Sequence, residues 1–309
     1  MNFVISNKSK KELFVSLFQV LKNCSSVISC AFQPECLHIQ GMDKSHVCLY
    51  DVKIAKDWFD TYTITDTKKI SFDSSVFHSI INTKSENQDL IVTLDTETED
   101  TLHIQFINTI NTDNIINNEE EKEKEQDQDQ EQGKAKSKKE GKAKSKKEGK
   151  GKKEEKSKKI VNEKNDFKKT FKMPLSEYEY EELNVPVVDY DAEFILSSKL
   201  TADIFAELSN FGNDIMVKCS EESIQLTTTG ITGEMCVQIP IDDLSSYSIV
   251  EGEEVSLNYS LVYLNKMCVT NKLTNEIEFY LSNDSPMKIS YSLGEDSILV
   301  FYMAPKSTF

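Results

Sequence analysis

Alternation of apolar and polar residues dominates the chain and predicts many β-strands. Successive side chains of a strand point to opposite faces, so an alternating segment buries one face and leaves the other in water. In the first part of the chain these segments span 37–40, 47–54, 70–72, 90–94 and 102–106. The last third of the chain contains partners of the same kind.

Four amphipathic segments interrupt the strands and predict helices. The segment 10–23 places Phe14, Leu17, Phe18 and Leu21 on one side and Ser16, Gln19, Lys22 and Asn23 on the other. The segment 198–211 directs inward Leu200, Ile204, Phe205, Leu208 and Phe211. Two shorter helices are expected at 74–83 and 259–270. The fold class that follows is α+β, with helices gathered on one face of antiparallel sheets.

The pattern repeats along the chain, which predicts two tandem domains of like design. Segments 27–30, 37–40, 70–73, 90–94 and 102–106 recur about 185 residues later, at 215–218, 224–227, 255–258, 277–281 and 287–291. The organisation that we expect is an N-terminal domain over 1–110 with its last strand at 166–175, an insert at 111–165, an interdomain connector at 176–190 and a C-terminal domain over 191–309.

The insert carries opposite charges in two blocks. Residues 119–131 contain eight acidic residues and two lysines, whereas 133–159 contain fourteen lysines and four glutamates. Because the insert has few apolar residues to bury, we expect it to be disordered.

The charge and composition of the chain limit the ways in which it could bind nucleic acid. The net charge is −16, and without the two charged blocks the remaining chain carries about −20. Such a body repels nucleic acid unless its cations gather on one surface. The chain contains no arginine, so bidentate recognition of guanine by a guanidinium group is excluded, and any contact with DNA must use the point charges of lysine and be insensitive to sequence.

Nothing in the chain predicts a secreted, membrane or metal-binding protein. We see no leader and no apolar run long enough to cross a bilayer, and expect a soluble intracellular protein. The seven cysteines are expected to be reduced, and Cys24, Cys30 and Cys36 lack the fourth ligand of a zinc site. A hydrolase using His46 or Cys48, expected on one strand face, is the alternative from another class, but no third catalytic group is identifiable.

Four motifs in order carry a family resemblance. They are LHIQGMDKSHVCLYDVKI at 37–54, WFDTY at 58–62, LNVP at 183–186 and YMAPK at 302–306. On them the chain resembles proliferating cell nuclear antigen, the eukaryotic-type DNA sliding clamp. The resemblance implies a DNA-clamp fold that assembles as a ring, a homotrimer, around double-stranded DNA. It implies no enzyme activity and no cofactor. The implied partners are DNA polymerase, other replication and repair proteins with clamp-binding peptides, and a clamp loader.

The resemblance also implies site residues. The partner-peptide pocket would comprise Met42, His46, Val47, Leu49, Leu183, Val185, Tyr190, Pro286, Tyr302, Ala304 and Pro305. The alternative for the apolar members is ordinary core packing. Ring closure would pair a strand at 166–173 with a strand at 232–239 of the next copy, burying Phe167 or Phe171 near Met235 and Val237.

The helices depart from the family pattern, because most positions that are basic there are neutral here. The lysines expected to face DNA are Lys10, Lys11, Lys22 and Lys266. One hypothesis is that the lysine-rich insert compensates by holding DNA or clamp-loader components near the ring; a solubilising or nuclear-targeting role is the alternative.

Two alternatives within the fold stay open. One is a checkpoint-type clamp subunit that assembles with different chains, and the other is a viral processivity factor that binds DNA without forming a closed ring. The abundance of Lys, Asn and Ile fits an A/T-rich genome of a protist or a large DNA virus. The expected location is the nucleus, or a viral replication compartment.

Overall fold

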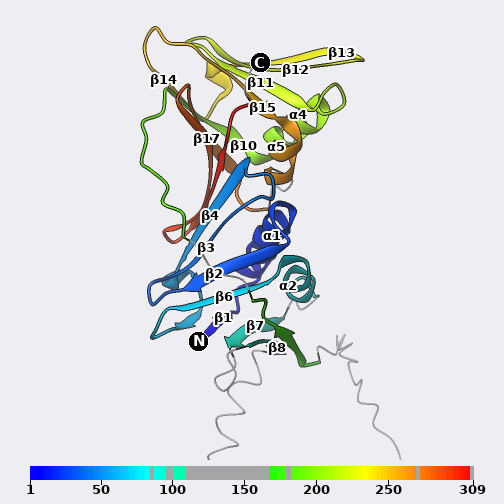
Figure 1. The fold of residues 1–309 in the computed structure, drawn as a ribbon, viewed down its shortest axis with the longest axis vertical. Coiled ribbons are helices and arrows are strands. Elements are labelled where there is room, and N and C mark those ends of the chain that lie inside the picture. Colours follow the sequence, from blue (N-terminus) through cyan, green and yellow to red (C-terminus); the bar gives the residue numbers. More distant parts are fainter. Residues whose placement is uncertain (84–86, 95–99, 109–166, 178–181, 269–271, 307–309) are drawn as a thin grey trace, which may run out of the picture.

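The computed structural model describes residues 1–83, 87–94, 100–108, 167–177, 182–268 and 272–306. The predicted insert at 111–165 lies outside these residues, as does part of the predicted connector, 178–181. Within the described part the chain forms antiparallel strands and four α-helices (Figure 1). None of the described helices is long and apolar enough to cross a lipid bilayer.

The first half of the chain contributes two helices and nine strands to the described structure. Its elements are β1 (Asn2–Ile5), α1 (Lys8–Cys24), β2 (Val27–Phe32), β3 (Cys36–Met42), β4 (Cys48–Ala55), the 3-10 turn η1 (Lys56–Trp58), β5 (Thr61–Thr63), β6 (Lys68–Asp73), α2 (Ser74–Ile81), β7 (Gln88–Leu94), β8 (Thr101–Asn108) and β9 (Lys169–Pro174).

The second half repeats this order. Its elements are β10 (Ala192–Ser197), α4 (Ser198–Leu208), β11 (Asp214–Cys219), β12 (Ser223–Gly230), β13 (Gly233–Pro240), the 3-10 turn η3 (Ile241–Asp243), β14 (Ser246–Ile249), β15 (Val255–Ser260), α5 (Leu261–Met267), β16 (Glu276–Ser282), β17 (Ser285–Gly294) and β18 (Ser297–Met303).

The sheets confirm the predicted tandem design. The outer sheet of the first half has the order β5-β1-β7-β8-β9, and the second half repeats it as β14-β10-β16-β17-β18. The set β4-β3-β2-β6 of the first half likewise recurs as β13-β12-β11-β15. The prediction of two like α+β domains with two helices each is therefore correct for the described residues.

One antiparallel joint fuses the two halves. Strand β18 pairs with β4, which makes a nine-stranded sheet that runs through both halves. Phe301 lies opposite Tyr50 and Leu299 opposite Val52, and all four side chains are buried, so the two cores are continuous. The indole nitrogen of Trp58 adds a hydrogen bond of 3.1 Å to the carbonyl of Leu293 across the joint.

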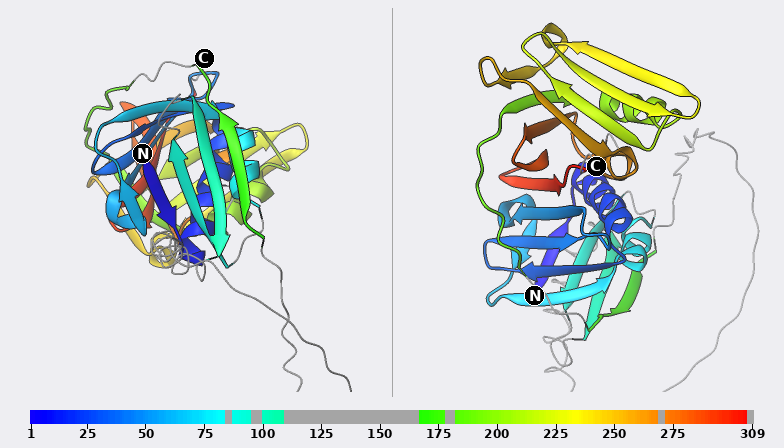
Figure 2. Two further views of the ribbon diagram at one scale, coloured as in Figure 1. Left: turned by 90° about the horizontal axis from the view of Figure 1, so that it is seen from below. Right: turned by 45° about the horizontal axis from the view of Figure 1, so that its top comes forward.

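The helices form one row along one side of the sheets (Figures 1 and 2). Helix α1 contacts α2 on one flank and α5 on the other, and α5 contacts α4. The side chain of Asn7 caps α1 by accepting hydrogen bonds from the amides of Ser9 and Lys10. Below α1 and α2, the rings of Phe14, Phe18 and Phe77 pack at tilted or edge-to-face angles with their centres 4.6–6.3 Å apart.

Three helix predictions need correction. Ser16 was expected on the solvent side of α1 but is buried. Its hydroxyl tolerates burial because it donates a hydrogen bond to the carbonyl of Glu12 one turn earlier in the helix. Leu200 and Phe211 were expected inward but are 44% and 36% exposed. Helix α4 ends at Leu208, so Phe211 lies outside the helical periodicity that was used to orient it.

Candidate functional site

A row of side chains crosses the nine-stranded sheet on the face opposite the helices. Strand pairing aligns Met42, Leu49, Tyr302, Lys288 and Tyr280 on five neighbouring strands. Directly paired residues share one face, and their strand neighbours Tyr50, Phe301 and Ile289 are buried in the core on the other face. The row therefore spans both halves on the outer surface.

The connector is fastened to this face by one buried side chain. Gln40 of β3 donates from Nε2 to the carbonyl of Leu183 at 3.0 Å and accepts from the amide of Leu183 at 2.7 Å. Gln40 is only 4% exposed. Nearby, Nε2 of His38 lies 2.8 Å from Asp51 and its Nδ1 lies 3.9 Å from Glu182 of the connector.

A groove of about 430 Å³ opens between the connector and the β2–β3 strands. It is lined by Ser25, Ser26, Val27, Ser29, Gln40, Gly41, Met42, Asp43, Lys44, His46, Tyr50 and Leu183. Three of the predicted docking residues, Met42, His46 and Leu183, thus meet around one cavity.

The turn between β3 and β4 is organised by Asp43. One carboxylate oxygen accepts from the amides of Val47 and Cys48, each at 2.7 Å, and the other accepts from the amide of Ser45 at 2.7 Å and the hydroxyl of Tyr263 at 2.9 Å. Burial alone would raise the pKa of Asp43, but these hydrogen bonds outweigh it and hold the pKa below its ordinary value.

His46 and Cys48 do not share a strand face, contrary to expectation. His46 lies in the turn with a φ of 54° and an exposed side chain, whereas Cys48 begins β4 and is buried. The pKa of the Cys48 thiol is raised by a hydrogen bond with Cys24 and by burial. A thiol with a raised pKa is a poor nucleophile, which disfavours the hydrolase alternative.

The remaining predicted docking residues form a second group, drawn from the start of β4 in the first half, from the connector and from the C-terminal half. The amide of Ala304 donates to the carbonyl of Val47 at 3.0 Å, and Leu49 pairs with Tyr302. The ring of Tyr190 lies 5.4 Å from that of Tyr280. Val185 and Pro305 are partly buried, and Pro286 is exposed at the start of β17.

Lys288 belongs to this second group but was missed from the sequence. Its ammonium lies 4.1 Å from the ring centre of Tyr280 and 5.9 Å from that of Tyr190, both within cation–π range. Burial, and then Tyr302, raise the pKa of Tyr190 to about 12. Strand alternation could have found Lys288, because it stands two positions after the predicted Pro286.

The lysines expected to face DNA have contacts within the chain. Lys10 donates to the carbonyl of Trp58 at 2.7 Å and pairs with Glu295 at 2.8 Å. Nζ of Lys22 lies 3.0 Å from Nδ1 of His78, and Lys266 lies 5.0 Å from the ring centre of Tyr263.

Lys11 departs most from that expectation. It is 9% exposed, and its ammonium donates to the carbonyl of Gln88. Burial lowers its pKa. A direct contact with DNA does not fit this placement.

The predicted ring-closure residues lie on two terminal strands. Phe171 of β9 packs its ring 6.2 Å from that of Phe106, while Phe167 precedes β9 and is 72% exposed. Met235 and Val237 are partly buried on β13. Strand β9 ends the five-stranded sheet and β13 ends the four-stranded sheet.

The described residues contain no group of three or more His, Cys, Asp or Glu side chains placed to hold a metal ion. The cysteines among these described residues form no disulfide bonds.

Comparison with known proteins identifies the family. Residues 7–132 match the family model "Proliferating cell nuclear antigen, N-terminal domain", and residues 184–306 match "Proliferating cell nuclear antigen, C-terminal domain". Among curated relatives, proliferating cell nuclear antigen 1 of Plasmodium falciparum is 28% identical over 161 residues, which cover 47% of this chain and 59% of the relative.

Proliferating cell nuclear antigen of Chaetomium thermophilum is 27% identical over 150 residues, covering 47% of this chain and 58% of the relative. The matched region thus spans little more than half the length of these relatives. The two domain matches, in contrast, fall on successive halves of the chain in the order of the observed repeat. The chain belongs to the proliferating cell nuclear antigen family.

Proposed function

We propose that the protein is a DNA sliding clamp, in which three copies close into a ring around duplex DNA and tether replication and repair enzymes without catalysing a reaction. Family membership supports this role, and so does the placement of the helices in one row on one side of the sheets. A closed ring retains DNA by enclosure, so weak contacts that ignore base sequence are sufficient. A chain without arginine suits this task.

The observation that carries the proposal is that the chain already contains one copy of the joint a ring needs. In the repeat, β18 is the counterpart of β9, and β4 is the counterpart of β13. Strands β18 and β4 pair with each other inside the chain, whereas β9 and β13 end their sheets. Pairing β9 of one copy with β13 of the next would repeat the internal joint head to tail, and such an interface closes into a ring when the rotation fits.

Comparison of the two halves also indicates which residues would lie opposite each other in that joint. Strand β9 pairs with β8 as β18 pairs with β17, so Phe171 corresponds to Phe301 and Lys172 to Tyr302. By the same comparison of β13 with β4, the counterparts of Tyr50 and Leu49 are Met235 and Glu234.

Transferring the internal pairs gives the contacts between copies. Phe301 lies opposite Tyr50 and Tyr302 opposite Leu49. The joint between copies would therefore set Phe171 against Met235 on the core side and Lys172 against Glu234 on the exposed side. The first pair buries apolar surface, and the second joins opposite charges.

Partner enzymes would dock on the outer face beneath the connector. The groove at Met42, His46 and Leu183 and the cluster around Tyr190 and Tyr302 would receive an extended peptide with aliphatic and aromatic anchors. DNA polymerase, other replication and repair proteins, and a clamp loader are the partners of this proposal. Its setting is the nucleus, or a viral replication compartment if the source is a virus.

Retention on circular DNA tests the proposal. Purified protein should have three times the mass of one chain by light scattering. After loading, it should stay on nicked circular duplex and leave when the circle is linearised, because only free ends let a ring slide off. Equal loss from both templates would contradict enclosure. If the protein has less than the mass of a trimer and binds both circular and linear DNA, it is an open processivity factor of the viral type. If it assembles only with other chains, it is a checkpoint-type clamp subunit.

A further inference from the structure

One buried histidine lies where the connector crosses the sheet. His38 of β3 is 3% exposed, and it stands two positions before Gln40, so the two side chains share the outer face of the strand. Gln40 binds the backbone of Leu183. The residue before Leu183 is Glu182, whose carboxylate lies 3.9 Å from Nδ1 of His38. His38 therefore meets the connector next to the point where Gln40 binds it.

The imidazole of His38 lies between two carboxylates. Its Nε2 is 2.8 Å from Oδ1 of Asp51, on strand β4. Because a carboxylate can only accept a hydrogen bond, Nε2 carries the hydrogen and donates it to Asp51. In the neutral imidazole the other nitrogen, Nδ1, then has a lone pair and no hydrogen. Neutral His38 can therefore donate to Asp51 but has nothing to donate to Glu182.

Protonation changes what Nδ1 can do. The distance of 3.9 Å between Nδ1 and Glu182 is longer than a hydrogen bond, which spans about 2.7–3.2 Å, but short enough for an ion pair. A protonated His38 carries a positive charge and has a hydrogen on both nitrogens, so it can hold Asp51 and Glu182 at once. Histidine is the side chain that ordinarily changes its charge between about pH 5 and pH 8.

Other titratable groups face His38 from the neighbouring strands. Strand pairing places Lys53 of β4 directly opposite His38, and Lys69 of β6 lies in the same row beyond β2. Both lysines are exposed, so water and salt weaken their repulsion of a charged imidazole. Cys36 stands two positions before His38, and burial raises the pKa of its thiol, which stays neutral in this range of pH. The two carboxylates, in contrast, approach the ring itself.

The partners of His38 border both groups of docking residues. Leu183, next to Glu182, lines the groove, so a connector held more firmly fixes one wall of that groove. On the other side, burial and then the charge of Asp51 raise the pKa of Tyr302, which belongs to the second group. His38 is not part of the groove lining, so it acts on the groove through these neighbours.

We propose that His38 is a positioning residue for the docking groove, and that its protonation fastens the connector by pairing with Glu182 while the contact with Asp51 is kept. The inference rests on the proposed docking of partner peptides and adds a dependence on pH to it. Because only the fastened connector brings Glu182 to the charged imidazole, fastening strengthens as the pH falls through the range in which histidine titrates.

Hydrogen exchange at the amide of Leu183 tests the inference, since this amide donates to Gln40 and is protected while the connector is in place. The protection factor, which corrects for the intrinsic effect of pH on exchange, is measured in the full chain at about pH 5.5 and about pH 7.5. In the wild type it should be about threefold higher at the lower pH, as expected of a partly exposed ion pair. H38N and E182Q should show no such difference.

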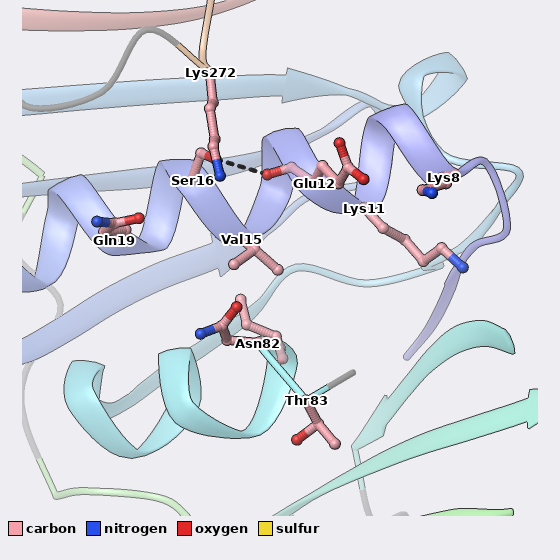
Figure 3. Close-up of a pocket in the computed structure, with 10 residues that line it drawn as sticks. Lys8, Lys11, Glu12, Val15, Ser16, Gln19, Asn82, Thr83 and Lys272 are labelled. Atoms are coloured by element: carbon pink, nitrogen blue, oxygen red, sulfur yellow. Dashed lines mark hydrogen bonds between the residues drawn. The ribbon is translucent and has the colours of Figure 1, made fainter. Parts of the chain in front are cut away.

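Two controls remove one carboxylate elsewhere. D189N changes an exposed position of the same connector, and E12Q changes helix α1 on the other side of the sheets, where Glu12 lines a cavity (Figure 3). Both should keep the wild-type dependence on pH. If E182Q also keeps it, or if D189N and E12Q lose it, the pair with His38 does not fasten the connector. The side chain of Glu182 is 60% exposed, so E182Q gives this answer even if H38N fails to fold.

A second measurement connects the fastening to docking. A histidine-free peptide with glutamine, aliphatic and aromatic anchors should bind the wild type up to about threefold more tightly at the lower pH, because a fastened connector loses less freedom on binding. In E182Q the two affinities should be equal. Exchange that depends on pH while peptide affinity does not would show that His38 does not position the groove. A peptide that binds at neither pH would reject the proposed docking instead, so the two failures are separable.

Discussion

Asp43 is the residue on which most local order around the groove depends. It is 4% exposed and accepts four hydrogen bonds, three within its own turn and one from Tyr263 of α5. Substitution by asparagine, D43N, turns an amide group toward backbone N–H donors and leaves some of them unsatisfied. We expect D43N to lower the free energy of unfolding by about 1–3 kcal/mol at neutral pH, measured by urea denaturation at fixed protein concentration.

The same carboxylate makes a defined contribution to pH dependence. Because the pKa of Asp43 is lower in the folded than in the unfolded chain, its stabilising effect is complete above the ordinary aspartate pKa of about 3.9 and is lost as the pH falls through the folded value. D43N should therefore lose less stability than wild type in that acid range. D57N, at an exposed aspartate, serves as the control and should keep the wild-type acid profile.

For single residues, the sequence predicted which side chains line the groove better than it predicted which partners each side chain contacts. The motif containing Met42 and His46 identified residues that do line the groove with Leu183. The fate of individual lysines could not be predicted, since Lys10 pairs with Glu295 at a distance of 285 residues along the chain. Helical periodicity shows which side of α1 a lysine occupies, but not which distant carboxylate or carbonyl the fold brings to it.

Gln40 of β3 makes two hydrogen bonds to the backbone of the connector at Leu183. Q40L removes both hydrogen bonds to the backbone of Leu183 while keeping the volume similar. We expect faster amide hydrogen exchange at 182–190, and binding of a peptide with glutamine, aliphatic and aromatic anchors weakened by about tenfold, the equivalent of about 1.4 kcal/mol.

The control is Q33L, which makes the same chemical change in the β2–β3 turn, where Gln33 contacts Cys36 instead of the connector. Exchange in the connector should stay at the wild-type rate in Q33L. Identical exchange in both variants would show that Gln40 does not hold the connector.

The periodicity of apolar residues predicted that the long helices and strands exist, but it did not predict the residues at which they begin and end. Segment 10–23 was predicted for a helix that spans Lys8–Cys24, and 198–211 for one that ends at Leu208. The four-residue strand β1 escaped prediction because it is too short for alternation to be evident. It is nonetheless an interior strand of its sheet, where pairing with β5 on one side and β7 on the other determines its structure more than local sequence does.

For the whole molecule, the proposed joint between copies leads to a prediction about charge. Lys172 and Glu234 are exposed and belong to terminal strands, and the proposed register sets them opposite each other. K172E and E234K should each weaken assembly, since an opposite pair becomes a like pair, while K172E/E234K should restore it. A cross-strand pair contributes about 0.2–1 kcal/mol, so we expect dissociation at several-fold higher protein concentration in each single variant.

Mass measured against protein concentration checks the register. K53E, which places the same charge change on the outer face of β4, should assemble like wild type. If K172E/E234K assembles no better than either single variant, the register inferred from the repeat is wrong.

The internal joint between β4 and β18 has a consequence for how DNA would enter such a ring. Should those two strands part, the connector still ties their domains together covalently, and the fastened segment at Leu183 favours rapid return. No peptide bond spans the seam between neighbouring copies. A DNA duplex would therefore enter through the interface between two chains. The strength of that interface, which no covalent bond supports, would determine how long the ring stays closed.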